Sequence, residues 1–228
     1  MSIIDKNTFA YLNKLDANNN RDWFNNHKDD YTGQHENMIG FADDLLALMN
    51  QHDQLETVSG KKSLHRIYRD VRFSKDKAPY KTHWGGSFKR ATKLLRGGYY
   101  YHIQPGGKSF IGGGFWSPNK EDLQRVREDL SINASELRSI ITSPDFVDTF
   151  EQLQGDQLKT APKGFDKEHT DIDLLRYKQF LIGRNFTDAE VMSKDFVHKA
   201  NETFQKMRPF FNYMSDALTT DSNGTPIY

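Results

Sequence analysis

The middle of the chain constrains the fold most, because its residues alternate between two faces as β-strands do. The motif G-G-Y-Y-Y-H-I-Q-P at 97–105 ends in the turn P-G-G at 105–107, and K-S-F-I-G-G-G-F-W follows at 108–116. Two extended runs joined by so short a turn are typical of a β-hairpin. Helical spacing of apolar residues takes over on both sides of this region.

The predicted fold is therefore α+β: a single domain over 1–228, with a central, mostly antiparallel sheet of about five strands. Helices from both ends of the chain are expected to cover this sheet. The expected strands are 64–73, 84–91, 97–104 and 108–116, which together span roughly 64–116, and 177–186. The expected helical regions are 5–50, 118–154 and a C-terminal helix at 193–218 that Pro209 kinks.

Several side chains predict where helices begin. Ser, Asn and Thr accept hydrogen bonds from the first turn of a helix, and proline suits its first position. The expected N-caps are Asn20, Ser117 before Pro118, Asn133, Ser143 before Pro144, and Thr187, which forms a capping box with Glu190.

Composition excludes several classes of protein. The 228 residues include no cysteine, so disulfides, thiolate nucleophiles and cysteine-based metal centres are ruled out. No run of about 18 apolar residues occurs, and the first residues lack an apolar signal segment. We therefore expect a cytoplasmic protein with no membrane partner.

Charge is distributed unevenly along a chain whose formal net charge is zero. Residues 61–96 carry 12 Lys and Arg against 2 Asp and Glu, a local charge of +10, and the remainder carries −10. Such asymmetry indicates a local attraction for anions rather than a global one.

The basic segment at 66–83 reads R-I-Y-R-D-V-R-F-S-K-D-K-A-P-Y-K-T-H. Guanidinium groups match phosphate and carboxylate oxygens, and Tyr80 or Trp84 could stack on a base or sugar. The predicted ligand-binding residues are Arg21, Arg69, Arg72, Lys75, Lys77, Tyr80, Lys81, Trp116 and Lys163, with His83 beside them. The alternative is that these cations pair with the chain's own carboxylates.

The motif R-D-V-R-F-S-K-D-K-A-P-Y-K-T-H resembles a block of the uncharacterised bacterial domain-of-unknown-function family 2461. N-N-N-R-D-W-F, G-Y-Y-Y-H-I-Q-P, G-G-G-F-W-S-P and L-K-T-A-P-K-G-F-D-K-E-H resemble its other blocks in order, over nearly the whole chain. Thr170 departs from the proline expected after the histidine. The resemblance implies no established activity.

Candidate catalytic groups are few. His83 lies in the basic segment, whereas His169 and Asp166 lie in the long irregular link 155–171, where Asp166 or Asp173 could orient the imidazole. No H-x-H or H-E-x-x-H motif occurs, so no metal site is predicted. P-loop, Rossmann and nucleophile-elbow motifs are absent as well, and no cofactor is assigned.

Four functions stay open on these observations. The first is binding of a phosphorylated or otherwise anionic small molecule in a cationic pocket on 66–83. The others are a histidine-dependent hydrolase of a phosphoester or glycosyl substrate, a nucleic-acid-binding protein, and a structural or partner-binding module. A pocket favours the first, and an extended stripe of cations favours nucleic acid.

Overall fold

The structure is a computed structural model that describes residues 1–221 and 225–227, and its fold is α+β. The chain divides into two compact units. Unit 1 comprises Met1–Phe88, Tyr100–Ile111 and Asn185–Glu202, and unit 2 comprises Lys89–Tyr99, Gly112–Arg184 and Thr203–Tyr228. Each strand of the sheet contributes residues to both units. One domain over 1–228 therefore stays a prediction.

Within the described residues, the sheet is antiparallel and has four strands, not the five predicted. They are β1 (Trp84–Lys89), β2 (Gly98–Ile103), β3 (Ser109–Phe115) and β4 (Phe180–Phe186), in the order β1-β2-β3-β4. The predicted hairpin is confirmed, since β2 and β3 are neighbours joined through the turn at 105–107.

The prediction of a strand at 64–73 is wrong. This stretch makes only isolated bridges, from Leu64 to Gly86 and from Tyr68 to Tyr80. Its backbone instead pairs locally, because the Arg69 N–H donates to the Pro79 carbonyl and the Lys81 N–H donates to the Ile67 carbonyl. Charged side chains at alternate positions mimic strand periodicity without providing a face that can be buried.

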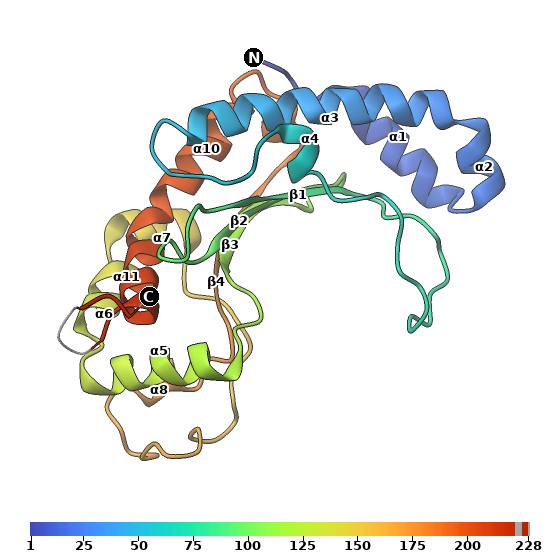
Figure 1. Cartoon of the computed structure of the whole chain (residues 1–228). Coiled ribbons are helices and arrows are strands. Elements are labelled where there is room, and N and C mark those ends of the chain that lie inside the picture. Colours follow the sequence, from blue (N-terminus) through green and yellow to red (C-terminus); the bar gives the residue numbers. More distant parts are fainter. Residues whose placement is uncertain (222–224, 228) are drawn as a thin grey trace. The chain divides into compact units, whose positions relative to one another are not determined.

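Unit 1 is built on helices from the start of the chain (Figure 1). The predicted region 5–50 forms α1 (Lys6–Ala17), α2 (Arg21–Asn26) and α3 (Lys28–Met49), and α4 (Gly60–Ser63) follows. Asn20 caps α2 as predicted, because its side chain accepts from the Trp23 N–H at 2.9 Å. Thr187 and Glu190 form the predicted capping box of α9 (Asp188–Val191).

Strand β2 has one buried face and one half-buried face. Tyr101 and Ile103 are 0% exposed, and Tyr101 packs against Phe41 of α3 and Phe88 of β1. The residues between and beside them, Tyr100 and His102, lie on the other face and are half-buried. This alternation positions the candidate site described below.

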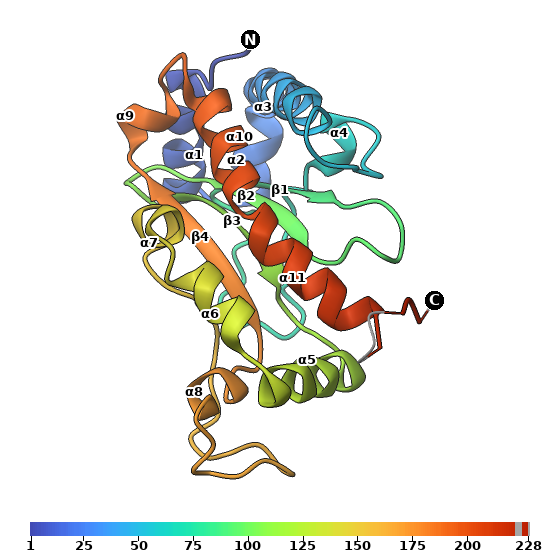
Figure 2. The same cartoon turned by 90° about the vertical axis from the view of Figure 1, so that its left-hand side faces the viewer.

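Unit 2 contains α5 (Lys120–Ile132), α6 (Ser135–Ile141), α7 (Pro144–Phe150), α8 (Ile172–Leu175) and α11 (Arg208–Thr219). Helices α5 and α8 lie side by side (Figure 2). Ser143 caps α7 as predicted. The cap of α5 is Asn119 rather than Ser117, and Ala134 takes the cap position of α6 that was predicted for Asn133.

The C-terminal helix predicted at 193–218 is two helices, α10 (Phe196–Lys206) and α11, separated at Met207. Pro209 lies in the first turn of α11. Proline has no N–H to donate, so it interrupts a continuous helix but suits a new first turn. In the described part of the chain, no helix combines the length and apolar character needed to cross a bilayer.

The glycines of β3 allow close packing within unit 2. A Cβ atom on Gly113 would lie 2.7 Å from the Phe211 ring, and one on Gly114 would lie 2.2 Å from the Phe180 carbonyl oxygen. Trp116, which follows β3, is 72% exposed and does not cover these glycines.

Gly86→Ala should destabilise the protein by about 2 kcal/mol, because the new methyl group would overpack a buried ring. Its Cβ would lie 2.2 Å from the ring of Tyr101. Gly33→Ala is the matched control in α3, where no atom lies within 4 Å, and it should stabilise by about 0.5–1 kcal/mol. Urea denaturation measures both, and equal effects would contradict the close packing.

Candidate functional site

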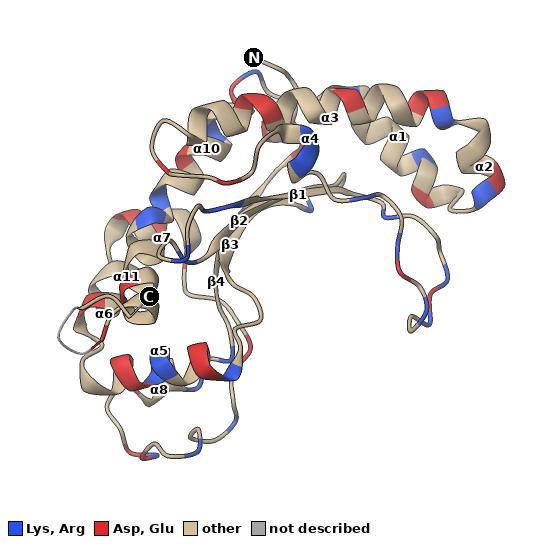
Figure 3. Cartoon of the chain, viewed as in Figure 1, with Lys and Arg blue, Asp and Glu red and all other residues tan. Residues whose placement is uncertain are grey.

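The basic segment 66–83 forms a loop of unit 1 between α4 and β1. Figure 3 shows Lys and Arg along this loop, interrupted by two acidic positions. It extends away from α3 and from β1 (Figure 1). The two backbone hydrogen bonds described above join the two sides of the loop near its ends. Most residues between these bonds are exposed to solvent.

Two arginines predicted to bind a ligand are paired within the loop. Arg69 contacts Asp76 at 2.5 Å and also donates to the Ala78 carbonyl, while Arg72 contacts Asp70 at 2.6 Å. Hydrogen bonds from Arg72 hold the pKa of Asp70 below its usual range. The alternative that cations pair with the chain's own carboxylates therefore holds for these two arginines.

The aromatic residues predicted to stack on a ligand are part of the core. Tyr80 is 3% exposed and stacks on Phe24 with 4.1 Å between ring centroids, and Trp84 is 1% exposed. Neither ring has a face free for a ligand, so that prediction is wrong. Tyr80 is also anchored by Asn19, whose side chain accepts from the Tyr80 N–H and donates to the Tyr80 carbonyl.

The remaining predicted residues are divided between the units. Arg21 is exposed at the start of α2, and its charge opposes the effect of burial, which raises the pKa of Tyr80. Arg21 therefore lies near the base of the basic segment. Lys75 and Lys77 are exposed in the loop, and Lys77 donates to the Val71 carbonyl. Trp116 and Lys163 are exposed and belong to unit 2.

Several rings gather beside the half-buried face of β2, and of these only His83 was predicted as a site residue. We call them the imidazole cluster: His65, which is exposed, and the half-buried His83, Tyr100, His102 and Phe110. The His83 and His102 rings stack at 4.1 Å, and the His102 and Phe110 rings stack at 4.9 Å. The alternation of Tyr100 and His102 with buried neighbours was the available sequence signal.

Hydrogen bonds engage two imidazoles in the cluster and fix the tautomer of His102. His102 Nε2 donates to Gln104 Oε1 at 2.8 Å, so its Nδ1 accepts from the Tyr100 hydroxyl at 3.2 Å. His65 Nε2 lies 3.1 Å from Ser87 Oγ. Within the described residues, the His83 ring has no hydrogen-bond partner, so both of its nitrogens are available to a ligand.

The surroundings of His83 are electropositive. Burial, followed by His102, Lys81 and His65, lowers the pKa of His83 to about 4. Burial also lowers the pKa of Lys81, with a contribution from Arg66. No carboxylate of the described residues hydrogen-bonds to an imidazole of the cluster. At neutral pH His83 is therefore an uncharged ring beside a cationic ammonium group.

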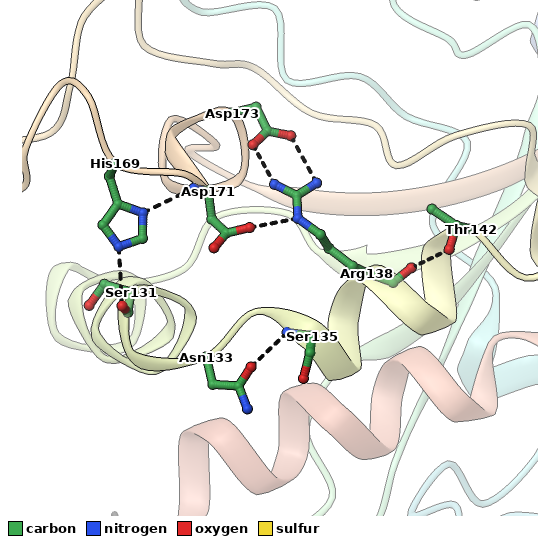
Figure 4. A network of polar contacts seen from close by, with 8 residues as sticks. All are labelled: Ser131, Asn133, Ser135, Arg138, Thr142, His169, Asp171 and Asp173. Carbon is green, nitrogen blue, oxygen red and sulfur yellow. Dashed lines mark hydrogen bonds and ion pairs between the residues drawn. The ribbon is translucent and has the colours of Figure 1, made fainter.

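His169, the other catalytic candidate, holds a loop of unit 2 together (Figure 4). Its Nδ1 accepts from the Asp171 N–H at 3.0 Å, and its Nε2 donates to the Ser131 carbonyl at 3.1 Å. Both ring nitrogens are thus occupied by backbone. Asp171 and Asp173 pair with Arg138 instead of orienting the imidazole.

Asp166 has a local role as well, because its carboxylate accepts from the Glu168 N–H. Within the described residues of the link 155–171, no carboxylate hydrogen-bonds to the ring of His169. The geometry of this loop therefore provides no acid–base pair.

Comparison with protein families gives one match, to the family described as conserved hypothetical protein (DUF2461), over residues 7–213. The chain belongs to this family. No curated protein and no solved structure matches the DUF2461 chain.

In the DUF2461 chain, no group of three or more His, Asp or Glu side chains among the described residues is arranged to hold a metal ion. The imidazole cluster offers its nitrogens and the nearby ammonium group as hydrogen-bond donors and acceptors. Such groups bind oxyanions and polar organic molecules.

The DUF2461 chain should lose stability as the pH falls. The pKa of His83 is about 4 in the folded protein and about 6.5 in an unfolded chain, so the unfolded state takes up the proton first. The stabilisation present above pH 6.5 is lost toward pH 4, on the order of 2 kcal/mol by pH 5. Urea denaturation of His83→Asn should show a smaller loss between pH 7.5 and pH 5. His198→Gln removes an exposed histidine of the same unit and is the control.

Proposed function

We propose that unit 1 binds an anionic small molecule, carrying a phosphate or a carboxylate, at the imidazole cluster. The observation that carries this proposal is the environment of His83. The ring is half-buried, stacked on His102 and without a hydrogen-bond partner among the described residues. Burial lowers the pKa of His83, and the basic side chains of His102, Lys81 and His65 lower it as well.

Partial burial of Lys81 strengthens the attraction of the imidazole cluster for an anion. Lys81 is half-buried and Arg66 is close enough to affect its pKa, so the local positive potential is only partly screened by water. An oxyanion would accept hydrogen bonds from Lys81 and from the N–H of His83. Charge-assisted bonds of this kind are stronger than neutral ones.

Binding should be coupled to a proton. An anion beside His83 offsets the charge of Lys81, which together with burial lowers the pKa of this imidazole, so the pKa rises when the ligand binds. By linkage, the ligand binds more tightly as the pH falls from 7.5 to 5.5. A fully protonated His83 donates from both nitrogens, which suits an oxyanion better than a neutral ring does.

This proposal keeps part of the site expected from the sequence. Lys81 and His83 stay in it, and Arg21 lies near the same end of the basic segment. Arg69 and Arg72 are paired with Asp76 and Asp70, so they are not assigned to this ligand. The alternative of a histidine-dependent hydrolase is less well supported, because its imidazole lacks a carboxylate partner among the described residues.

The test is a titration of the full chain with inorganic phosphate and glucose 6-phosphate, and with glucose as the uncharged control. We expect the ring signals of His83 and His102 to shift in NMR spectra with the two phosphates only. Lys81→Ala should weaken binding by about tenfold, because one charge-assisted hydrogen bond is lost. Lys14→Ala, on the exposed face of α1, is the matched control.

Calorimetry at pH 5.5 and pH 7.5 checks the coupling to a proton. The ratio of affinities at pH 5.5 and pH 7.5 should be larger for the unsubstituted chain than for His83→Asn, because the second protonation of the phosphate, at about pH 6, affects both proteins alike. Unchanged imidazole signals with both phosphates at both pH values would contradict the proposed function.

A further inference from the structure

The first part of the basic segment has exposed aromatic rings as well as cations. We call residues 66–77 the basic loop. Phe73 is 95% exposed, the highest fraction among the large hydrophobic residues of the described chain, and Tyr68 is 58% exposed. Aromatic rings are normally covered on folding, and exposed ones are enriched where a partner binds.

Cations alternate with these rings along the basic loop. The Arg72 guanidinium lies 5.9 Å from the centroid of the Phe73 ring. Lys75 and Lys77 follow the same ring in sequence and are exposed. The basic residues of the loop are Arg66, Arg69, Arg72, Lys75 and Lys77.

The Arg72–Asp70 ion pair leaves its arginine in solvent, whereas the Arg69 side chain is only 28% exposed and also donates to the Ala78 carbonyl. Arg72 and its partner Asp70 have side chains that are 77% and 60% exposed, and Asp76 is 66% exposed. Exposed ion pairs contribute little to stability. A phosphate group can therefore replace Asp70 as the partner of Arg72 at small cost.

We propose that the basic loop binds single-stranded nucleic acid, with Phe73 and Tyr68 stacking on bases and the neighbouring cations contacting phosphates. A single strand presents unpaired rings and regularly spaced phosphates, which is the pattern that alternating aromatic and cationic side chains match. The loop forms an exposed stripe of cations, the arrangement that distinguishes a nucleic-acid surface from a pocket.

An anionic membrane surface fits these residues less well. Binding to lipid requires a continuous apolar area together with the cations. Next to Phe73 the loop offers Val71, which is half-buried, and otherwise charged or polar side chains. Two separated rings provide stacking faces but little area for insertion between lipids.

The inference does not depend on the function proposed for the imidazole cluster. The basic loop contributes Arg66 to the charge near Lys81, but its rings and its other cations are not part of the cluster. Substitutions at Phe73 and at His83 therefore test different sites. Phe73→Ala should leave binding of glucose 6-phosphate unchanged, and His83→Asn should leave binding of an oligonucleotide unchanged.

The experiment uses the full chain and fluorescein-labelled 15-nucleotide single strands of mixed DNA and RNA sequence, followed by fluorescence anisotropy. Phe73→Ala should weaken binding by about tenfold or more, since an aromatic ring stacked on a base contributes strongly to affinity. Phe73→Trp should restore it. Val58→Ala replaces a hydrophobic residue of unit 1 that is 80% exposed and is the matched control.

Salt dependence tests the phosphate contacts. The logarithm of the binding constant should fall linearly with the logarithm of salt concentration, by about 0.7 per phosphate contact on a single strand. Lys75→Ala should reduce the slope by about that amount, whereas Phe73→Ala should leave the slope unchanged. Circular dichroism confirms that each variant is folded.

Three results would overturn the inference. The first is the absence of binding to either oligonucleotide at low salt. The second is equal affinity of Phe73→Ala and the unsubstituted chain. The third is binding to phosphatidylserine vesicles that requires Phe73 while oligonucleotides fail to compete, which would reassign the basic loop to a lipid surface.

Discussion

Burial of one face of β2 is the constraint on which the rest of the candidate site depends. Tyr101 and Ile103 are removed from water, and because side chains alternate along a strand, Tyr100 and His102 must lie on the opposite face. A shift of one residue in register would exchange the two sets and expose the core aromatics. The placement of Tyr100 and His102 in the imidazole cluster therefore follows from the hydrophobic effect acting on their buried neighbours in β2.

Exposure to solvent sets how strongly the charges of the basic residues of unit 1 interact. In the imidazole cluster, burial lowers the pKa of both His83 and Lys81, which are half-buried. In the basic loop, water screens the charges, and Asp70 and Asp76 pair with arginines in exposed positions. Residues close together in sequence thus form two surfaces with different chemistry. The imidazole cluster suits a small anion, and the exposed rings and cations of the basic loop suit a polymer.

Features that depend on local interactions could be predicted from the sequence. The β2–β3 hairpin, the Ser143 cap and the Thr187 capping box each involve residues within a few positions of one another. The prediction of a strand at 64–73 was wrong because a strand depends on a partner that local sequence does not specify. Alternation describes a strand only when a neighbouring strand is available, and this stretch pairs with the turn that follows it.

The sequence by itself determined the α+β class, the concentration of positive charge in 61–96 and the exclusion of cysteine chemistry. Only the tertiary structure decided that Tyr80 is a core residue, that His169 is bound by backbone at both nitrogens, and that His83 meets His102. The physical reason is that burial and pairing depend on contacts between distant parts of the chain. Residue type and spacing describe what a side chain can do, whereas its neighbours in space select what it does.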